Sequence, residues 1–239
     1  MDAFLCTKTT IGEGMGMGSY SPCHVLWLAA GALYIVIVSR LYARGGAESR
    51  RTIRILVALL VLADEALKYL VTIPTGQWEW SFLPLHLCSI SVFVIALHAF
   101  HPDDRVAEYL YAVSLPTALM ALVFPNWMML PCWNWESIHS FTIHILIVSY
   151  PVMLLCGGFR PCFRRLVYSF PFLAVAVVVA VVANRFLDTN FLFLNSGDEG
   201  NPLSFLEKLV GGWYVLAFPM IAALVWSIMY LVPRRLKWS

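Results

Sequence analysis

The chain has 239 residues, of which 60% are hydrophobic and only 13% are charged, and this composition excludes an ordinary soluble domain. In lipid each backbone polar group must be satisfied within its own segment, so the long apolar runs must be helices and the predicted fold class is all-α, a polytopic membrane bundle. The formal net charge of +2 is scattered over the loops, which excludes a nucleic-acid-binding surface.

Seven stretches are apolar enough to cross a bilayer, which needs about 20 residues at about 1.5 Å of rise each. The residues before the first stretch hold no apolar core of signal-peptide length, and we interpret them as a short tail. The fourth stretch has Ser114, Pro116 and Thr117 at its centre. We predict one transmembrane domain over residues 1–239, with spans at 20–41, 53–73, 82–100, 106–124, 137–156, 166–186 and 211–232.

Lysine and arginine gather in alternate loops, which sets the predicted orientation. The cationic segments are the loops at 42–54 and 157–165 and the C-terminal tail, and with seven spans all three lie on one side. The other loops are poor in cations and carry aromatic residues such as Trp127, Trp133 and Trp135. The N-terminus is therefore predicted outside and the C-terminus in the cytosol, in a multi-pass protein of the plasma membrane.

This topology sorts the six cysteines. Cys156 and Cys162 lie near the inner face, and Cys88 lies inside the third span. Near the outer face the spacing permits a disulfide but does not choose its partners. The three cysteines there are Cys6, Cys23 and Cys132.

Ionisable side chains inside a span are costly in lipid and usually face the interior of a bundle, so each one marks a candidate site. Counted from the outer end at about 1.5 Å per residue, four chemically active residues lie roughly 8 to 12 Å deep and share one level. They come from three different spans and are Cys88, His144, Glu65 and Lys68.

Helical spacing separates the histidines of the fifth span, because residues three, four or seven apart share a face. Ser137, Ser140 and His144 form one polar stripe, whereas His139 points elsewhere. His144 is therefore the better inward candidate.

The third span carries His86 and Cys88 in the segment PLHLCS. Residues two apart lie on roughly opposite sides of a regular helix, so His86 is a poor base for Cys88 unless Pro84 distorts the first turn. We therefore look to another helix for the base.

The leading interpretation is covalent catalysis, in which the Cys88 thiol attacks an acyl carbon and His144 takes its proton. An acidic side chain would orient the imidazole. Glu65 is the preferred one, because Asp64 and Lys68 are four residues apart and can neutralise each other.

The same residues admit other interpretations. A thiol in a membrane helix often only packs, and a histidine often only bonds a neighbouring helix. Asp64 and Lys68 also fit a proton or substrate relay, so a small-solute transporter or ligand-binding membrane protein is the alternative function. A third alternative is a structural subunit that binds a partner within the membrane. No HxxxH or CxxC spacing places two ligands on one helical face, so no metal or other cofactor is predicted.

Three segments carry a resemblance to a known family: LPLHLCSISVF at 83–93, the fifth span around His144, and TNFLFLNSGDEGNPLSFLEKLVGGWYVLAF at 189–218. They resemble the YwaF-like integral membrane proteins, which are related to transmembrane protein 164, a cysteine-dependent phospholipid acyltransferase. The resemblance runs through spans three to seven in the same order.

The resemblance implies an acyltransferase that acts on membrane phospholipid, with Cys88 as the cysteine of the PLHLC motif and His144 as the histidine of the fifth span. The late loop is expected to fold over the outer mouth of the site, and its amides or a backbone amide near Pro84 are the expected oxyanion donors. The residues expected to bind substrate are His86, Asp64, Lys68, His139, Ser140, Asn184, Asn190 and Asn195.

Overall fold

A computed structural model describes residues 3–8, 10–197 and 202–235. This part of the chain is helical and contains no strand, which confirms the predicted all-α class. Six of its helical segments are long and apolar enough to cross a membrane. They are Pro22–Arg44, Trp80–Phe100, Asp104–Val123, Trp135–Cys156, Phe163–Leu187 and Leu203–Leu231.

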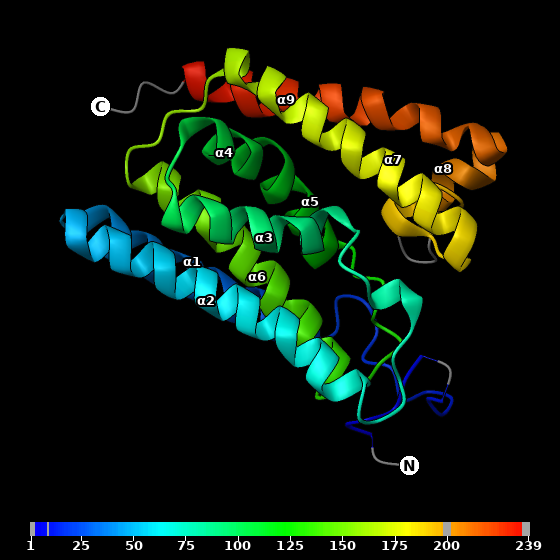
Figure 1. The fold of residues 1–239 in the computed structure, drawn as a ribbon. Coiled ribbons are helices and arrows are strands. Elements are labelled where there is room, and N and C mark those ends of the chain that lie inside the picture. Colours follow the sequence, from blue (N-terminus) through cyan, green and yellow to red (C-terminus); the bar gives the residue numbers. More distant parts are fainter. Residues whose placement is uncertain (1–2, 9, 198–201, 236–239) are drawn as a thin grey trace.

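The helices follow one another through short turns and 3-10 segments (Figure 1). The α-helices are α1 (Pro22–Arg44), α2 (Ala47–Thr72), α3 (Leu87–Phe100), α4 (Asp104–Tyr109), α5 (Leu115–Val123), α6 (Trp135–Cys156), α7 (Ser169–Leu187), α8 (Pro202–Val210) and α9 (Ala217–Arg235). The short segments are η1 (Trp80–Phe82), the π-helix η2 (Leu110–Ser114), η3 (Phe163–Tyr168), η4 (Phe191–Phe193) and η5 (Gly211–Leu216).

The helix α2 has 26 residues, and at about 1.5 Å of rise each it is long enough to cross a bilayer. It is more polar than the six apolar segments because Asp64, Glu65 and Lys68 lie in its second half. Charges at this depth have to be neutralised within the bundle, and the partners that do so form part of the site described below.

Between α4 and α5 the fourth apolar segment is interrupted by η2. Pro116 lacks a backbone N–H, so a regular helical ladder cannot continue through it. The neighbouring hydroxyls are satisfied inside the bundle: the Ser114 Oγ donates to the Ser91 Oγ of α3 at 2.7 Å, and the Thr117 Oγ1 donates to the Val113 carbonyl at 2.8 Å. The polar centre of this segment is therefore buried against α3 and not exposed to lipid.

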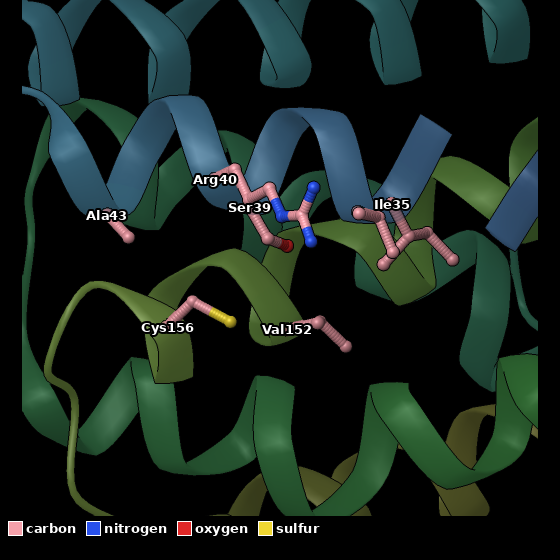
Figure 2. A pocket seen from close by; sticks show the side chains of 7 residues that line it. Ile35, Ser39, Arg40, Ala43, Val152 and Cys156 are labelled. Carbon is pink, nitrogen blue, oxygen red and sulfur yellow. The ribbon is translucent and has the colours of Figure 1, made fainter. Parts of the chain in front are cut away.

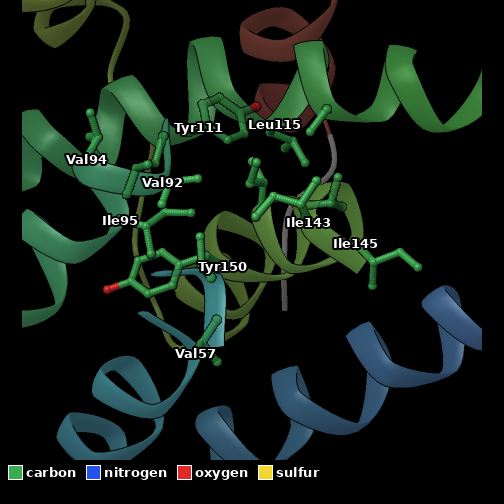
Figure 3. Close-up of a cluster of buried hydrophobic side chains, with 14 of the residues drawn as sticks. Val57, Val92, Val94, Ile95, Tyr111, Leu115, Ile143, Ile145 and Tyr150 are labelled. Atoms are coloured by element: carbon green, nitrogen blue, oxygen red, sulfur yellow. The ribbon is translucent and has the colours of Figure 1, made fainter. Parts of the chain in front are cut away.

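The helix α6 lies at the centre of the fold and packs against α1, α2 and α5. Figure 3 shows its Ile143 and Tyr150 within the buried apolar cluster, close to Ile95 of α3 and Val57 of α2. The fully buried Tyr150 hydroxyl lies 3.0 Å from the Nδ1 of His98. This core fixes α2, α3 and α6 relative to one another.

Close approach of α1 to α6 depends on a small residue. A Cβ on Gly31 would lie 2.8 Å from both Cδ1 and Cγ1 of Ile145 on α6. Small residues at helix interfaces let backbones approach in membranes, where packing drives association.

The outward faces of α7 and α9 are apolar. Val175 and Phe186 of α7 and Met220 and Leu224 of α9 are among the exposed large side chains. Such a surface is stable only in contact with hydrocarbon, so lipid is the solvent of these helices.

One end of the bundle is closed by the N-terminal tail, which lies with the ends of α2 and α7 to the right in Figure 1. The Nδ2 of Asn134 donates to the Cys6 carbonyl at 2.8 Å, and the Met17 amide donates to the Leu130 carbonyl at 3.0 Å. A disulfide joins Cys23 at the start of α1 to Cys132 before α6, and Cys6 is a free, buried thiol. We call this the disulfide end.

At the opposite end, the arginine end, Arg50 holds the carboxyl termini of two helices together. Its guanidinium donates to the Tyr42 carbonyl of α1 at 3.1 Å and to the Gly157 carbonyl after α6 at 2.9 Å. The last carbonyls of a helix lack hydrogen-bond donors and carry partial negative charge. A guanidinium supplies both the donors and the positive charge.

We expect Gly31→Val to lower stability by about 1–3 kcal/mol, the cost of overpacking a core contact. The measurement is the midpoint of thermal unfolding in detergent. Gly212→Val is the matched control, since a Cβ there meets nothing within 4 Å. Adding Ile145→Ala to Gly31→Val should restore part of the loss, and failure to restore any would show that the contact with α6 is not its cause.

We expect Cys23→Ser to lower the unfolding midpoint markedly, because the bridge closes a loop of 109 residues. In the chain-entropy view such a loop contributes roughly 4–5 kcal/mol. Mobility on a non-reducing gel should shift for Cys23→Ser and Cys132→Ser alike. The control Cys162→Ser removes a free thiol and should leave both readouts unchanged.

Candidate functional site

The start of α3 places Cys88 in the first turn of a helix. Pro84 lies between the 3-10 turn η1 and α3, and the helix begins at Leu87, five residues after the start of the predicted span. His86 is the N-cap residue, with extended backbone at φ −74° and ψ 151°. The sequence argument that put His86 and Cys88 on opposite sides of one regular helix therefore does not apply, because His86 is outside the helix.

The first turn of α3 has free backbone donors. The first helical bond runs from the Ile90 amide to the His86 carbonyl at 2.9 Å, and no side chain caps the helix. Within the described chain, the amides of Leu87, Cys88 and Ser89 therefore have no acceptor. Such amides and the helix dipole favour negative charge at this position.

The Cys88 thiol is half-buried at the edge of the core. The Tyr109 hydroxyl is buried beside Cys88 and Ser91. The end of α4 thus brings one hydroxyl, which has no hydrogen-bond partner in the described structure, to the neighbourhood of the thiol.

The orientation of His144 is fixed by its own helix and by an aromatic ring. Its Nδ1 lies 2.6 Å from the backbone carbonyl of Ser140, and its ring stacks on Trp127 with 5.4 Å between ring centroids. A carbonyl only accepts, so Nδ1 carries the hydrogen and Nε2 keeps a lone pair. Ser140, which was predicted to bind substrate, contacts His144 through its backbone carbonyl.

Asp64 faces α6. Its carboxylate lies 3.3 Å from the Nδ1 of His139 and accepts a hydrogen bond from the Thr142 hydroxyl at 3.1 Å. His144 lies within electrostatic range of Asp64, His139 and His86. Asp64 of the second predicted span is thus in direct contact with His139 and Thr142 of the fifth.

Glu65 and Lys68 form a buried ion pair on α2, with 2.6 Å between the Lys68 Nζ and the Glu65 Oε1. The Tyr69 hydroxyl also lies 3.4 Å from Glu65. The predicted pairing of Asp64 with Lys68 is wrong, because the i,i+3 spacing puts Glu65 and Lys68 on one buried face while Asp64 turns to α6. Glu65 contacts Lys68 and not His144, whose orientation comes from the Ser140 carbonyl.

The three asparagines expected to bind substrate are engaged in building the late loop. The Asn184 side chain accepts the Phe191 amide at 2.7 Å and donates to the Phe191 carbonyl at 3.0 Å. Asn190 donates to the Ser196 carbonyl at 2.8 Å, and Asn195 donates to the Thr189 carbonyl at 2.9 Å. Their amides have structural partners, which leaves the predicted substrate contacts to other groups.

The late loop lies over the start of α3. The rings of Phe191 and Phe193 contact the His86 ring, with centroid distances of 5.3 and 5.4 Å. Leu192 and Phe193 both have positive φ, at 58° and 55°, a conformation that costs non-glycine residues about 1–3 kcal/mol each. Hydrogen bonds from Asn184 and from the Tyr214 hydroxyl hold the loop in this strained form.

The candidate site therefore consists of a thiol group on α3 and an imidazole group on α6. Within the described residues, no hydrogen bond joins Cys88 to His144. The thiol is set in the first turn of α3 near Tyr109, and the imidazole is set on α6 against Trp127. No group of three or more metal-ligating side chains occurs in the described part of the chain.

Sequence reasoning did not identify Tyr109 and Trp127 as site residues. Trp127 was noted only as an aromatic residue of a loop poor in cations, and Tyr109 was not singled out. The available signal was the polar centre of the fourth span, since interrupted helices often occur at functional sites.

Comparison with known proteins gives one match. The chain matches the TMEM164 family over residues 19–230, which is most of its length. This confirms the relation to transmembrane protein 164 inferred from the segments at 83–93 and 189–218. No curated protein and no solved structure matches the chain.

We expect Asn184→Ala to loosen the late loop, because it leaves the buried N–H and C=O of Phe191 without partners, at a cost on the order of 3 kcal/mol. Hydrogen exchange of the Phe191 amide and limited proteolysis within 188–197 measure this. Asn195→Ala removes an exposed contact of the same loop and should have a smaller effect. An Asn184→Ala variant with a protected loop but no activity would instead place Asn184 in substrate binding.

Proposed function

Because the chain belongs to the TMEM164 family, we propose that it is a membrane-embedded, thiol-dependent acyltransferase or lipid hydrolase acting on phospholipid acyl chains. Cys88 is the nucleophile and His144 is the general acid and base. The observation that carries this proposal is the position of Cys88 in the uncapped first turn of α3, where free amides and the helix dipole favour a thiolate.

In the first step the Cys88 thiol gives its proton to the Nε2 of His144 and its sulfur attacks the ester carbonyl carbon of a phospholipid. The bond from carbon to the glycerol oxygen then breaks, and that oxygen takes the proton back from the imidazolium. The products are a lysophospholipid and an acyl thioester on Cys88. Contacts between catalytic groups are often long without substrate and shorten when it binds.

In the second step an acceptor hydroxyl attacks the thioester carbon while the Nε2 of His144 takes its proton. The carbon–sulfur bond breaks, and the imidazolium returns the proton to the sulfur. Water as the acceptor gives a fatty acid, and a lysolipid or another alcohol gives a new ester. One acid–base group serves both steps, because each proton that it takes is returned before the next step.

Negative charge on the carbonyl oxygen needs donors in both steps. The amides of the first turn of α3 are suited to this role because they have no acceptor within the described chain. The Tyr109 hydroxyl, which has no hydrogen-bond partner in the described structure, is a further donor.

The location fits a lipid substrate. Ester carbonyls of glycerolipids lie at the boundary of the hydrocarbon, and Cys88 is in the first turn of α3, in the outer half of the apolar segment Trp80–Phe100. Phe191 and Phe193 supply apolar surface beside His86 for an acyl chain. This surface also excludes water from a thioester that water would otherwise hydrolyse.

We expect incubation of the purified protein with phospholipid to add one acyl chain, detected by intact mass and removed by hydroxylamine. Cys88→Ala should abolish the adduct. His144→Ala should keep the fold and slow adduct formation by about 10²–10⁴-fold, the usual loss for a general acid–base group.

Cys162→Ser is the matched control for this experiment, since it removes a free thiol at the other end of the bundle. It should form the adduct at the wild-type rate. Absence of an adduct on the wild type, together with unaltered turnover in Cys88→Ala, would defeat the proposal. Solute flux in vesicles that is lost in Asp64→Asn but kept in Cys88→Ser would favour a transporter.

A further inference from the structure

A groove lies between α1 and α6 at the arginine end, away from Cys88 and His144 (Figure 2). Its volume is about 330 Å³. Cys156, at the end of α6, lies at one end of it and is exposed. Along α6, Cys156 is about 18 Å from His144 at 1.5 Å per residue, so the groove is separate from the proposed catalytic site.

An unpaired cation lines the groove. Arg40 lies four residues before the end of α1, about 6 Å inside the helix at 1.5 Å per residue. It is exposed and has no hydrogen-bond or ion-pair partner within the described residues, in contrast to Arg50 and Arg165, which bind carbonyls and carboxylates. A charged group near the end of a membrane span is stabilised by pairing, and Arg40 is free to pair with an anion from outside the protein.

A buried hydroxyl lines the same groove. Ser39 is only 4% exposed, and its Oγ has no hydrogen-bond partner in the described structure. Serine in a helix commonly donates to the carbonyl four residues earlier, and Ser39 does not. A hydroxyl without a partner in an apolar environment costs free energy, and an oxygen of a bound ligand would remove this cost.

The rest of the wall is apolar and follows the helix into the bilayer. Ile35 and Val36 lie one turn deeper on α1 than Ser39 and Arg40, and Val152 lies opposite on α6. No acidic side chain lines the groove. From the end of α1 inward, the order is therefore a cation, a hydroxyl donor and a hydrocarbon surface.

We propose that this groove binds one anionic phospholipid of the leaflet at the arginine end. The phosphate pairs with Arg40, the glycerol ester oxygens lie at Ser39, and one acyl chain lies along Ile35 and Val152. The order of groups in a phospholipid, phosphate then ester then chain, matches the order of groups along α1. The lipid binds without covalent chemistry and stabilises the contact between α1 and α6, so this inference does not depend on the proposed acyl transfer.

The test uses the purified full chain in detergent with added phosphatidylglycerol. Native mass spectrometry measures the bound lipid, and the rate of Cys156 alkylation by N-ethylmaleimide reports occupancy of the groove, with Cys162 as the internal comparison. We expect one retained lipid and slower alkylation of Cys156 alone. Phosphatidylcholine with the same chains should bind more weakly, because its choline adds a cation near Arg40.

Arg40→Gln should raise the Kd for phosphatidylglycerol about tenfold, the loss of one charge-assisted hydrogen bond. Ser39→Ala should raise it about threefold. Arg51→Gln is the matched control, since it removes an exposed arginine at the same end that does not line the groove, and it should leave the Kd unchanged.

Equal effects of Arg40→Gln and Arg51→Gln would overturn the proposal, as would equal binding of the two lipids. Protection of Cys156 by inorganic phosphate alone would also overturn it, because the ligand would then be a free anion. Cys88→Ala should bind phosphatidylglycerol like the wild type, so failure of the catalytic proposal and failure of this one are distinguishable.

Discussion

The need to satisfy every polar group inside the bundle governs this structure, because lipid offers no hydrogen bonds in return. Asp64 meets this requirement with α6, Glu65 meets it with Lys68, and Arg50 meets it with helix carbonyls. The groups left without partners are then informative. The amides at the start of α3 and the Ser39 and Arg40 side chains are such groups, and they lie where bound ligands would complete them.

The fold class and the helical segments could be predicted from composition and apolar length, because a membrane permits few alternatives. The sequence also gives an expected depth for each candidate residue, since rise per residue converts position in a span into depth. Depth counting selected Cys88 and His144 from different spans. Composition and depth do not depend on how each helix is rotated about its axis. For this reason they predict the fold class and the helical segments without knowledge of the packing.

The contacts of the individual side chains depend on how each helix is rotated about its axis and on the residue at which it begins. The choice between Asp64 and Glu65 as the partner of Lys68 depends on which face of α2 meets α6, and sequence spacing allows both. The role of His86 depends on whether α3 begins before or after it, and Pro84 settled this locally. The asparagines at 184, 190 and 195 were expected to bind substrate. Their side chains instead bond groups six or seven residues away in the same segment, and only the folded loop reveals these bonds.

The disulfide between Cys23 and Cys132 also bears on biosynthesis. Cys23 is made 109 residues before its partner, and at ordinary elongation rates this takes roughly 5 to 20 s. During that interval the nearest available thiol is Cys6, which ends up buried and free beneath Asn134. Once Asn134 has been made, docking of the tail against the segment before α6 buries Cys6 and removes this competing thiol.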